Sequence, residues 1–133
     1  MAAFAEGIPS FAAGLPRPNI TIDEVRRLAA ELYGVAGEVR ELGSQQDRNF
    51  LFTEPGSPPH APSRRVLFKV SNRAVRRDEI EAQNEAMRRM HGAGHPSPAP
   101  LPSVNGHDIE TADVNGSPHS IRLLTFVEGT PLI

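Results

Sequence analysis

The stretch RRVLFKVSN, from Arg64 to Asn72, places a single lysine inside an apolar run with the composition of a strand. Alternate side chains of a strand share a face, so Leu67 and Lys69 are predicted to lie together. The opposite face then carries Val66, Phe68 and Val70. Burying an ammonium is costly unless it has acidic or hydrogen-bonding partners. Lys69 therefore either belongs to a binding site or extends along its apolar stem from an edge strand to water.

The composition indicates one modest domain. The chain has 133 residues, of which 38% are hydrophobic, so the core must be small. A net charge of −2 gives no field that would attract nucleic acid or an anionic membrane surface, and one tyrosine with no tryptophan disfavours a β-sheet RNA binder. The absence of cysteine excludes disulfides and thiol chemistry and fits a cytoplasmic protein.

The N-terminal residues 1–19 are expected to form a flexible tail containing proline and glycine. They lack the basic leader and unbroken apolar run of a signal peptide. No segment of the sequence approaches the roughly 20 apolar residues needed to span a bilayer. We therefore expect neither a membrane nor a nucleic acid among the partners.

Two helices are predicted. Thr21 followed by Glu24 is a capping-box pattern and predicts a helix over Ile22–Tyr33, which Gly34 is well placed to end. A second helix is predicted over Asp78–His91, where acids gather in the first turns and arginines in the last.

Five short strands are predicted around the second helix. Three precede it, over Glu38–Leu42, Asn49–Thr53 and Arg65–Val70. Two follow it, over Ile109–Ala112 and Ser120–Val127, and Asn115-Gly116 is the expected hairpin turn between them. Proline-rich connections separate several of these elements. The prediction is an α+β fold with a five-stranded antiparallel sheet, one helix inserted after the third strand and an N-terminal helix.

This order of elements matches the small lobe of a protein-kinase-like fold. The sequence resembles the aminoglycoside phosphotransferase family, most closely its hydroxylysine kinase-like members and more distantly choline and homoserine kinases. The stretches that carry the resemblance are LGSQQDRNFLF, VLFKVSN, IEAQNEAM, HPSPAPLPSVNG and IRLLTFVEGTPL. The resemblance implies a nucleotide-binding lobe over residues 20–127 and the start of a hinge to a C-terminal lobe at 128–133.

The resemblance also implies a role for the strand lysine. Lys69 would contact the α and β phosphates of ATP and would be held by an acid of the following helix, while Leu67 would cover the adenine. Glu81 matches the family stretch and is the expected partner of Lys69. Glu85 and Gln83 are alternatives, because the apolar face of the helix does not aim Glu81 directly inward. These acids could instead pair with arginines along the helix surface.

Two backbone segments complete the site that the resemblance implies. The turn containing Gly43, Ser44, Gln45 and Gln46 would cover the phosphates with its backbone amides. The same residues fit an ordinary hairpin turn equally well. The Phe126 carbonyl and the Val127 amide would pair with the adenine edge.

Other chemistry finds little support. His91 and His95 have helical spacing but glycines intervene and no third ligand is near, so no zinc site is expected. No nucleophile elbow indicates a hydrolase.

The predicted function is the ATP-binding lobe of a kinase that phosphorylates a hydroxyl of an amino alcohol or hydroxy amino acid. Its cofactor would be ATP with Mg²⁺. The Mg²⁺ ligands and the catalytic aspartate are expected outside this chain. This chain would therefore contribute no catalytic residue and would have no turnover alone. The alternative is a non-catalytic docking module within a larger class III aminotransferase or phospho-lyase fusion, where pyridoxal phosphate would bind to the other domain.

Overall fold

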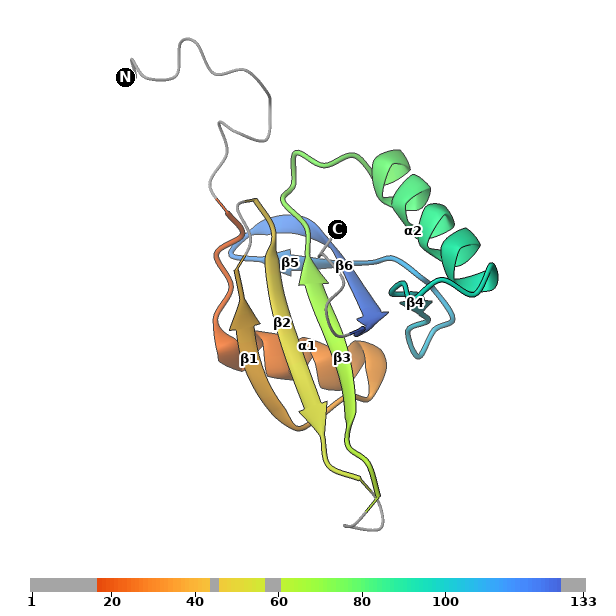
Figure 1. Ribbon diagram of the computed structural model, residues 1–133. Helices are drawn as coiled ribbons and strands as arrows, with labels where there is room; N and C mark the ends of the chain where they lie inside the picture. The colour runs from red at the N-terminus through yellow and green to blue at the C-terminus, as the bar shows by residue number, and fades with distance from the viewer. Residues whose placement is uncertain (1–16, 44–45, 57–60, 128–133) are drawn as a thin grey trace.

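The structure is a computed structural model that describes residues 17–43, 46–56 and 61–127 (Figure 1). Of the expected tail at residues 1–19, residues 1–16 lie outside the described residues, and so does the expected start of a hinge at 128–133.

Helix α1 (Ile22–Tyr33) has the predicted bounds, because the local signals at both ends are satisfied. The Glu24 amide donates to Thr21 Oγ1 at 3.2 Å, and the Thr21 amide donates to the Glu24 carboxylate at 3.1 Å. This reciprocal pair satisfies two amides that have no partner inside the helix. Gly34 ends the helix in the left-handed conformation, with φ of 65°.

The sheet is antiparallel, with strand order β1-β2-β3-β6-β4. The fifth strand in the chain, β5, pairs with the first half of β6 on the side away from β3, and β4 pairs with the second half. The strands are β1 (Glu38–Leu42), β2 (Arg48–Glu54), β3 (Arg64–Val70), β4 (Pro100–Leu101), β5 (Glu110–Val114) and β6 (Ser117–Thr125). The predicted α+β class is confirmed.

The main core lies between α1 and one face of the sheet. Val25 and Leu28 of α1 pack there against Phe68 of β3, and Figure 1 shows the helix crossing behind the strands. The other residues of this face include Phe50, Phe52, Val66, Val70, Ile121 and Leu123. The predicted alternation along β3 is therefore confirmed, because Leu67 belongs to a separate cluster on the opposite face.

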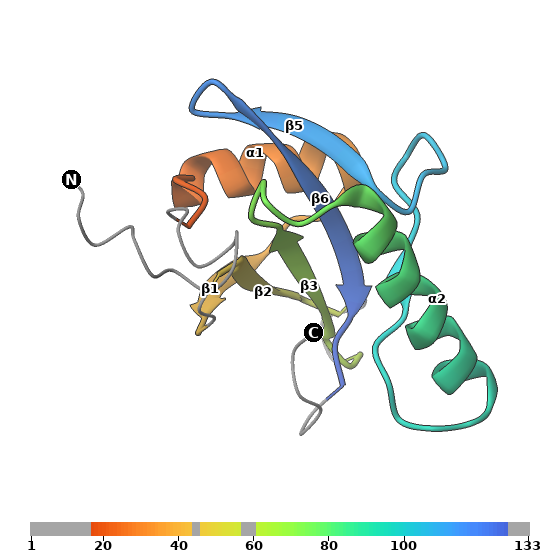
Figure 2. The same cartoon turned by 90° about the horizontal axis from the view of Figure 1, so that it is seen from above.

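Helix α2 (Arg77–Gly92) lies on the β6 and β4 side of the sheet (Figure 1 and Figure 2). Its Met87 packs with Leu67 of β3 and Leu124 of β6 in a smaller second cluster. Lys69 and Arg122 occur two residues from Leu67 and Leu124 in their strands, so they share this second face. The α2 face is therefore part apolar and part charged.

The hairpin strands are longer toward the turn than predicted. Asn115 and Gly116 both have positive φ, 55° and 84°, and this two-residue turn pairs Val114 directly with Ser117. Such turns match the twist of the flanking strands, so pairing continues up to the turn.

The prediction of five strands is wrong by one within the described residues, which form six. Pro100 and Leu101 pair with Leu124 and Leu123 at the edge of the sheet. A proline is tolerated there because its missing amide is not needed at an edge. Among the residues that the structure describes, no helix is long and apolar enough to cross a membrane.

Candidate functional site

The ammonium of Lys69 lies on the α2 face of the sheet and is almost completely buried, since 3% of the side chain is exposed. Its Nζ donates to Asn49 Oδ1 at 3.0 Å. Asn49 is the register partner of Lys69 on β2, so the sheet itself sets this contact. The edge-strand alternative fails, because β3 is an inner strand between β2 and β6.

The carboxylate nearest to Lys69 comes from the loop before β2. Asp47 Oδ2 lies 3.4 Å from Lys69 Nζ, and 17% of the Asp47 side chain is exposed. The other oxygen of Asp47 accepts a hydrogen bond from the Asn72 amide at 2.8 Å. Asp47 thus joins the loop before β2 to the segment after β3.

A second buried cation lies beside Lys69. Arg122 of β6 is the register partner of Lys69, and it is 1% exposed. Its Nη1 donates to Asn84 Oδ1 and its Nη2 to Gln83 Oε1, both at 3.0 Å. We call the group of Asp47, Asn49, Lys69, Gln83, Asn84 and Arg122 the Lys69–Arg122 cluster.

The charges in this cluster do not balance, since two cations face one carboxylate. Two buried donors in it, Asn49 Nδ2 and Arg122 Nε, also have no acceptor among the described residues. An unpaired buried donor costs about 1–3 kcal/mol. The excess positive charge and the unused donors together favour an oxyanion as ligand.

The pKa of Lys69 reflects this environment. Burial lowers the pKa of the ammonium, Asp47 opposes the shift, and Arg122 adds to it. Burial is also the largest cause of the lowered pKa of Arg122, and Asp47 again opposes it. One carboxylate therefore supports both cations.

The predicted pairing of Lys69 with a helix acid is wrong in this structure. Glu81 pairs with Arg77 at 3.5 Å, and 60% of its side chain is exposed. Glu85 pairs with Arg89 at 3.0 Å on the same outer surface. The helix turns these acids outward because Ile80 and Met87 must face the protein interior, which brings Asn84 inward. Gln83, the third alternative, does reach the cluster, but it contacts Arg122.

The predicted phosphate turn is described only in part, because Ser44 and Gln45 lie outside the described residues. Gly43 is exposed, its φ is not in the left-handed region, and a methyl group on it would meet no other described residue within 4 Å. Nothing in the described part of the chain therefore requires glycine at this position. The Gln46 carbonyl accepts from Asn72 Nδ2 at 3.5 Å, next to Asp47.

The remaining predicted residues occupy different parts of the lobe. Leu67 shares the face of Lys69 and is buried against Met87. Phe126 and Val127 follow the end of β6 and are half-buried. The Arg65 guanidinium lies 5.1 Å from the centre of the Phe126 ring.

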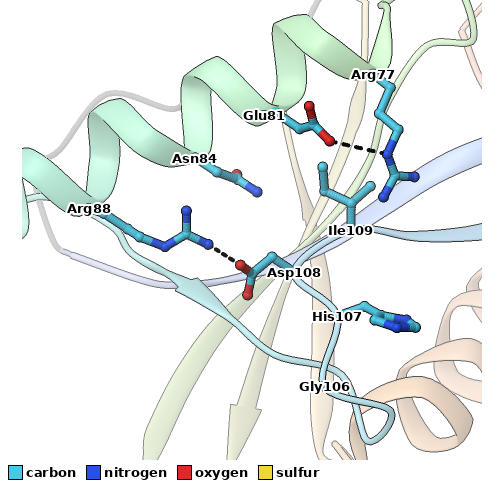
Figure 3. Close-up of a pocket in the computed structure, with 8 residues that line it drawn as sticks. All are labelled: Arg77, Glu81, Asn84, Arg88, Gly106, His107, Asp108 and Ile109. Carbon is cyan, nitrogen blue, oxygen red and sulfur yellow. Dashed lines mark hydrogen bonds and ion pairs between the residues drawn. The ribbon is translucent and has the colours of Figure 1, made fainter.

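A cavity of about 290 Å³ lies between α2 and residues 106–109 (Figure 3). Two ion pairs, Arg77 with Glu81 and Arg88 with Asp108, line it. Asn84 also lines the cavity and bonds to Arg122, so it connects the cavity with the cluster.

Sequence reasoning missed four members of the cluster as site residues: Asp47, Asn49, Asn84 and Arg122. One signal was available for Arg122, because it interrupts the apolar run IRLLTF just as Lys69 interrupts VLFKV. No comparable signal marks Asp47, whose contact with Lys69 depends on how the loop folds.

Comparison with known proteins supports the fold. No protein-family model matches the sequence, and no curated protein matches it. Among solved structures, the chain is similar to the amicoumacin kinase hAmiN in complex with AMP-PNP, Ca²⁺ and Ami. The TM-score is 0.63 at 16% sequence identity, over 84% of this chain.

The described residues therefore have the fold of a protein-kinase-like N-lobe. The matched part spans 32% of the length of the amicoumacin kinase, about a third.

Proposed function

We propose that this chain is the nucleotide-binding lobe of a small-molecule kinase in the aminoglycoside phosphotransferase family. Residues 20–127 would form the lobe, and 128–133 would begin the hinge to a catalytic lobe. The intact enzyme would transfer the γ-phosphate of ATP to a hydroxyl of an amino alcohol or hydroxy amino acid. The similar amicoumacin kinase was solved with AMP-PNP and Ca²⁺, which agrees with a nucleotide and a divalent cation as ligands.

The observation that carries the proposal is the excess positive charge at Lys69 and Arg122 on the α2 face of the sheet. An ammonium has three N–H donors, and Asn49 and Asp47 use two of them. The third donor of Lys69 would bind an oxygen of the α or β phosphate. Phosphoryl transfer is catalysed by positioning together with charge neutralisation of this kind.

The rest of the nucleotide would extend along the same face. Leu67 would contact the adenine, and the Phe126 carbonyl and Val127 amide would bind its edge. Gly43, Ser44, Gln45 and Gln46 would cover the phosphates through their backbone amides. No other described residue lies within 4 Å of where a side chain on Gly43 would begin, which supports this placement, since phosphate oxygens could approach the backbone there. Glu81 would have no direct part.

The base that orients the acceptor hydroxyl and the Mg²⁺ ligands would come from the catalytic lobe. This chain alone would bind the nucleotide without turnover.

One observation favours a second candidate. The ammonium of Lys69 is buried and already paired with Asp47, as expected if this ion pair stabilises the lobe and binds no ligand. The chain would then be a kinase-like docking module, for example in a fusion with an aminotransferase whose pyridoxal phosphate binds elsewhere.

Nucleotide titration distinguishes the two functions. MgATP added to the 133-residue chain should shift the backbone amide signals around Lys69 and Gln46 and raise the melting temperature. At a nucleotide concentration 100 times the dissociation constant, the added stability is about 2.7 kcal/mol. Lys69→Met should abolish both responses, whereas Arg27→Gln should keep them. Arg27 is the matched control because it is an exposed cation of α1 paired with Glu31, on the other side of the sheet.

The docking module predicts a different outcome. It predicts that MgATP changes neither the signals nor the melting temperature of the unaltered chain. Responses that persist in Lys69→Met would also refute the site, since the nucleotide would then bind elsewhere.

A further inference from the structure

We propose that Arg122 is a positioning residue that connects the Lys69 strand to helix α2, in the place where a helix acid was expected to hold Lys69. The catalytic meaning of this connection rests on the proposed kinase function, but the connection itself does not.

The geometry of Arg122 suits this role. Its two terminal nitrogens bond to two consecutive residues of α2, Gln83 and Asn84, each at 3.0 Å. A planar guanidinium that makes two such bonds sets the orientation of its partner more strictly than a single ammonium contact does. Because Arg122 pairs in register with Lys69, it also sets the distance between α2 and the ammonium.

The other polar contacts of α2 have a different character. Glu81 and Glu85 form exposed ion pairs within the helix, and Arg88 reaches Asp108 across the cavity surface. Exposed pairs of this kind contribute little to stability. The bond from Arg122 to Asn84 is buried and the bond to Gln83 is partly buried, so their loss would leave buried polar groups of Arg122 and Asn84 unpaired.

Neutral acceptors on the helix also have an electrostatic consequence. A helix acid at Lys69 would cancel one positive charge, whereas Gln83 and Asn84 cancel none. The charged groups that face Lys69 are then Asp47 from the loop and Arg122 from β6, while Asn49 is neutral. Arg122 thereby keeps the Lys69 site more positive and more attractive to an anion.

Hydrogen exchange of the α2 amides, measured without nucleotide, tests the connection. Asn84→Ala removes one acceptor and keeps both cations, and Arg122→Met removes the guanidinium. Each should reduce the protection of α2 amides roughly tenfold or more, as expected for a buried bond to a charged group. Arg88→Gln is the matched control, because it breaks an exposed bond of the same helix and should change protection less than about threefold.

The pH at which the Lys69 ammonium titrates provides a second test, because it would not change if Arg122 had only a structural role. Arg122→Met should shift this titration to higher pH, because a neighbouring positive charge is removed. Asn84→Ala should leave it nearly unchanged, since the charges remain. If Arg122→Met does not fold, Asn84→Ala and Asn84→Asp decide the question, because the aspartate should restore or increase the α2 protection that alanine loses.

The inference is overturned if α2 protection in Asn84→Ala equals that in the Arg88→Gln control, or if Lys69 titrates at the same pH with and without Arg122. These results do not depend on nucleotide binding. An unaltered chain that fails to bind MgATP would refute the proposed function while the connection through Arg122 still stands.

Discussion

Replacing Asp47 with asparagine isolates the charge that supports buried Lys69. The change keeps the size of the side chain and keeps an oxygen that can accept from the Asn72 amide, so the loop can retain its 2.8 Å bond. What disappears is the negative charge 3.4 Å from the ammonium. The variant therefore leaves two buried cations without a carboxylate among the described residues of the cluster.

The size of the effect follows from the burial of both groups. At 3.4 Å the Coulomb energy is about 5 kcal/mol for an effective dielectric constant of about 20. Removing one partner of a buried ion pair lowers the free energy of unfolding by about 3–5 kcal/mol. Because the asparagine dipole and Asn49 still solvate the ammonium, we expect a loss of about 3 kcal/mol in the free energy of unfolding.

The loss should depend on pH. Asp47 raises the pKa of Lys69, so its removal lowers that pKa further below the ordinary value of 10.5. Between the lowered pKa and 10.5, the unfolded chain binds more protons than the folded chain, and stability rises with pH. The destabilisation in Asp47→Asn should thus be largest near neutral pH and should shrink as pH approaches 10.5.

Urea denaturation over this pH range measures both effects. Asp78→Asn is the control, because Asp78 forms an exposed pair with Arg76 at 2.9 Å and should lose less than about 1 kcal/mol. A loss in Asp47→Asn that matches this control, with no dependence on pH, would refute the account of a buried and charge-supported lysine.

Two further predictions concern backbone positions. Gly43→Ala should leave the melting temperature unchanged, because the new methyl group meets no other described residue within 4 Å. It should nevertheless weaken MgATP binding in a calorimetric titration if phosphates approach this backbone. Gly37→Ala is its counterpart, since a methyl group there would lie 2.3 Å from the Thr53 carbonyl oxygen at φ of 138°, and it should unfold at lower urea concentration. Equal stabilities of the two variants would contradict this reasoning. Thr21→Ala removes the acceptor of the Glu24 amide and should cost about 1 kcal/mol by urea denaturation, whereas an unchanged midpoint would show that the cap contributes nothing.

The sequence predicted the elements whose ends carry local signals. The capping box at Thr21 and the left-handed Gly34 determine α1 from neighbouring residues alone, and Asn115-Gly116 does the same for the hairpin. The short strand at Pro100 was missed because its two residues pair only with a distant segment. Local patterns contain no information about such an edge.

The candidate site was predictable only in its centre. A lysine in an apolar strand pointed to Lys69, and strand alternation placed Leu67 beside it correctly. The partners of Lys69 and Arg122 come from β2, β6 and α2, which are far apart in the sequence. The helical pattern alone did not decide whether Glu81, Glu85 or Gln83 would face Lys69. The rotation of α2 decided against both acids, because Ile80 and Met87 are buried and Asn84 lies on their side.

Strand β6 also has a mechanical consequence. Its backbone is bonded to β3 over residues 121–125, and Thr125 is held from the other side by Ala99 through its amide and its hydroxyl, each at 2.9 Å. A force along the strand axis at Phe126 would load these bonds in parallel, as shear, rather than one after another. Displacement of the segment after Thr125 would thus be transmitted stiffly to the guanidinium of Arg122, three residues earlier in the same strand.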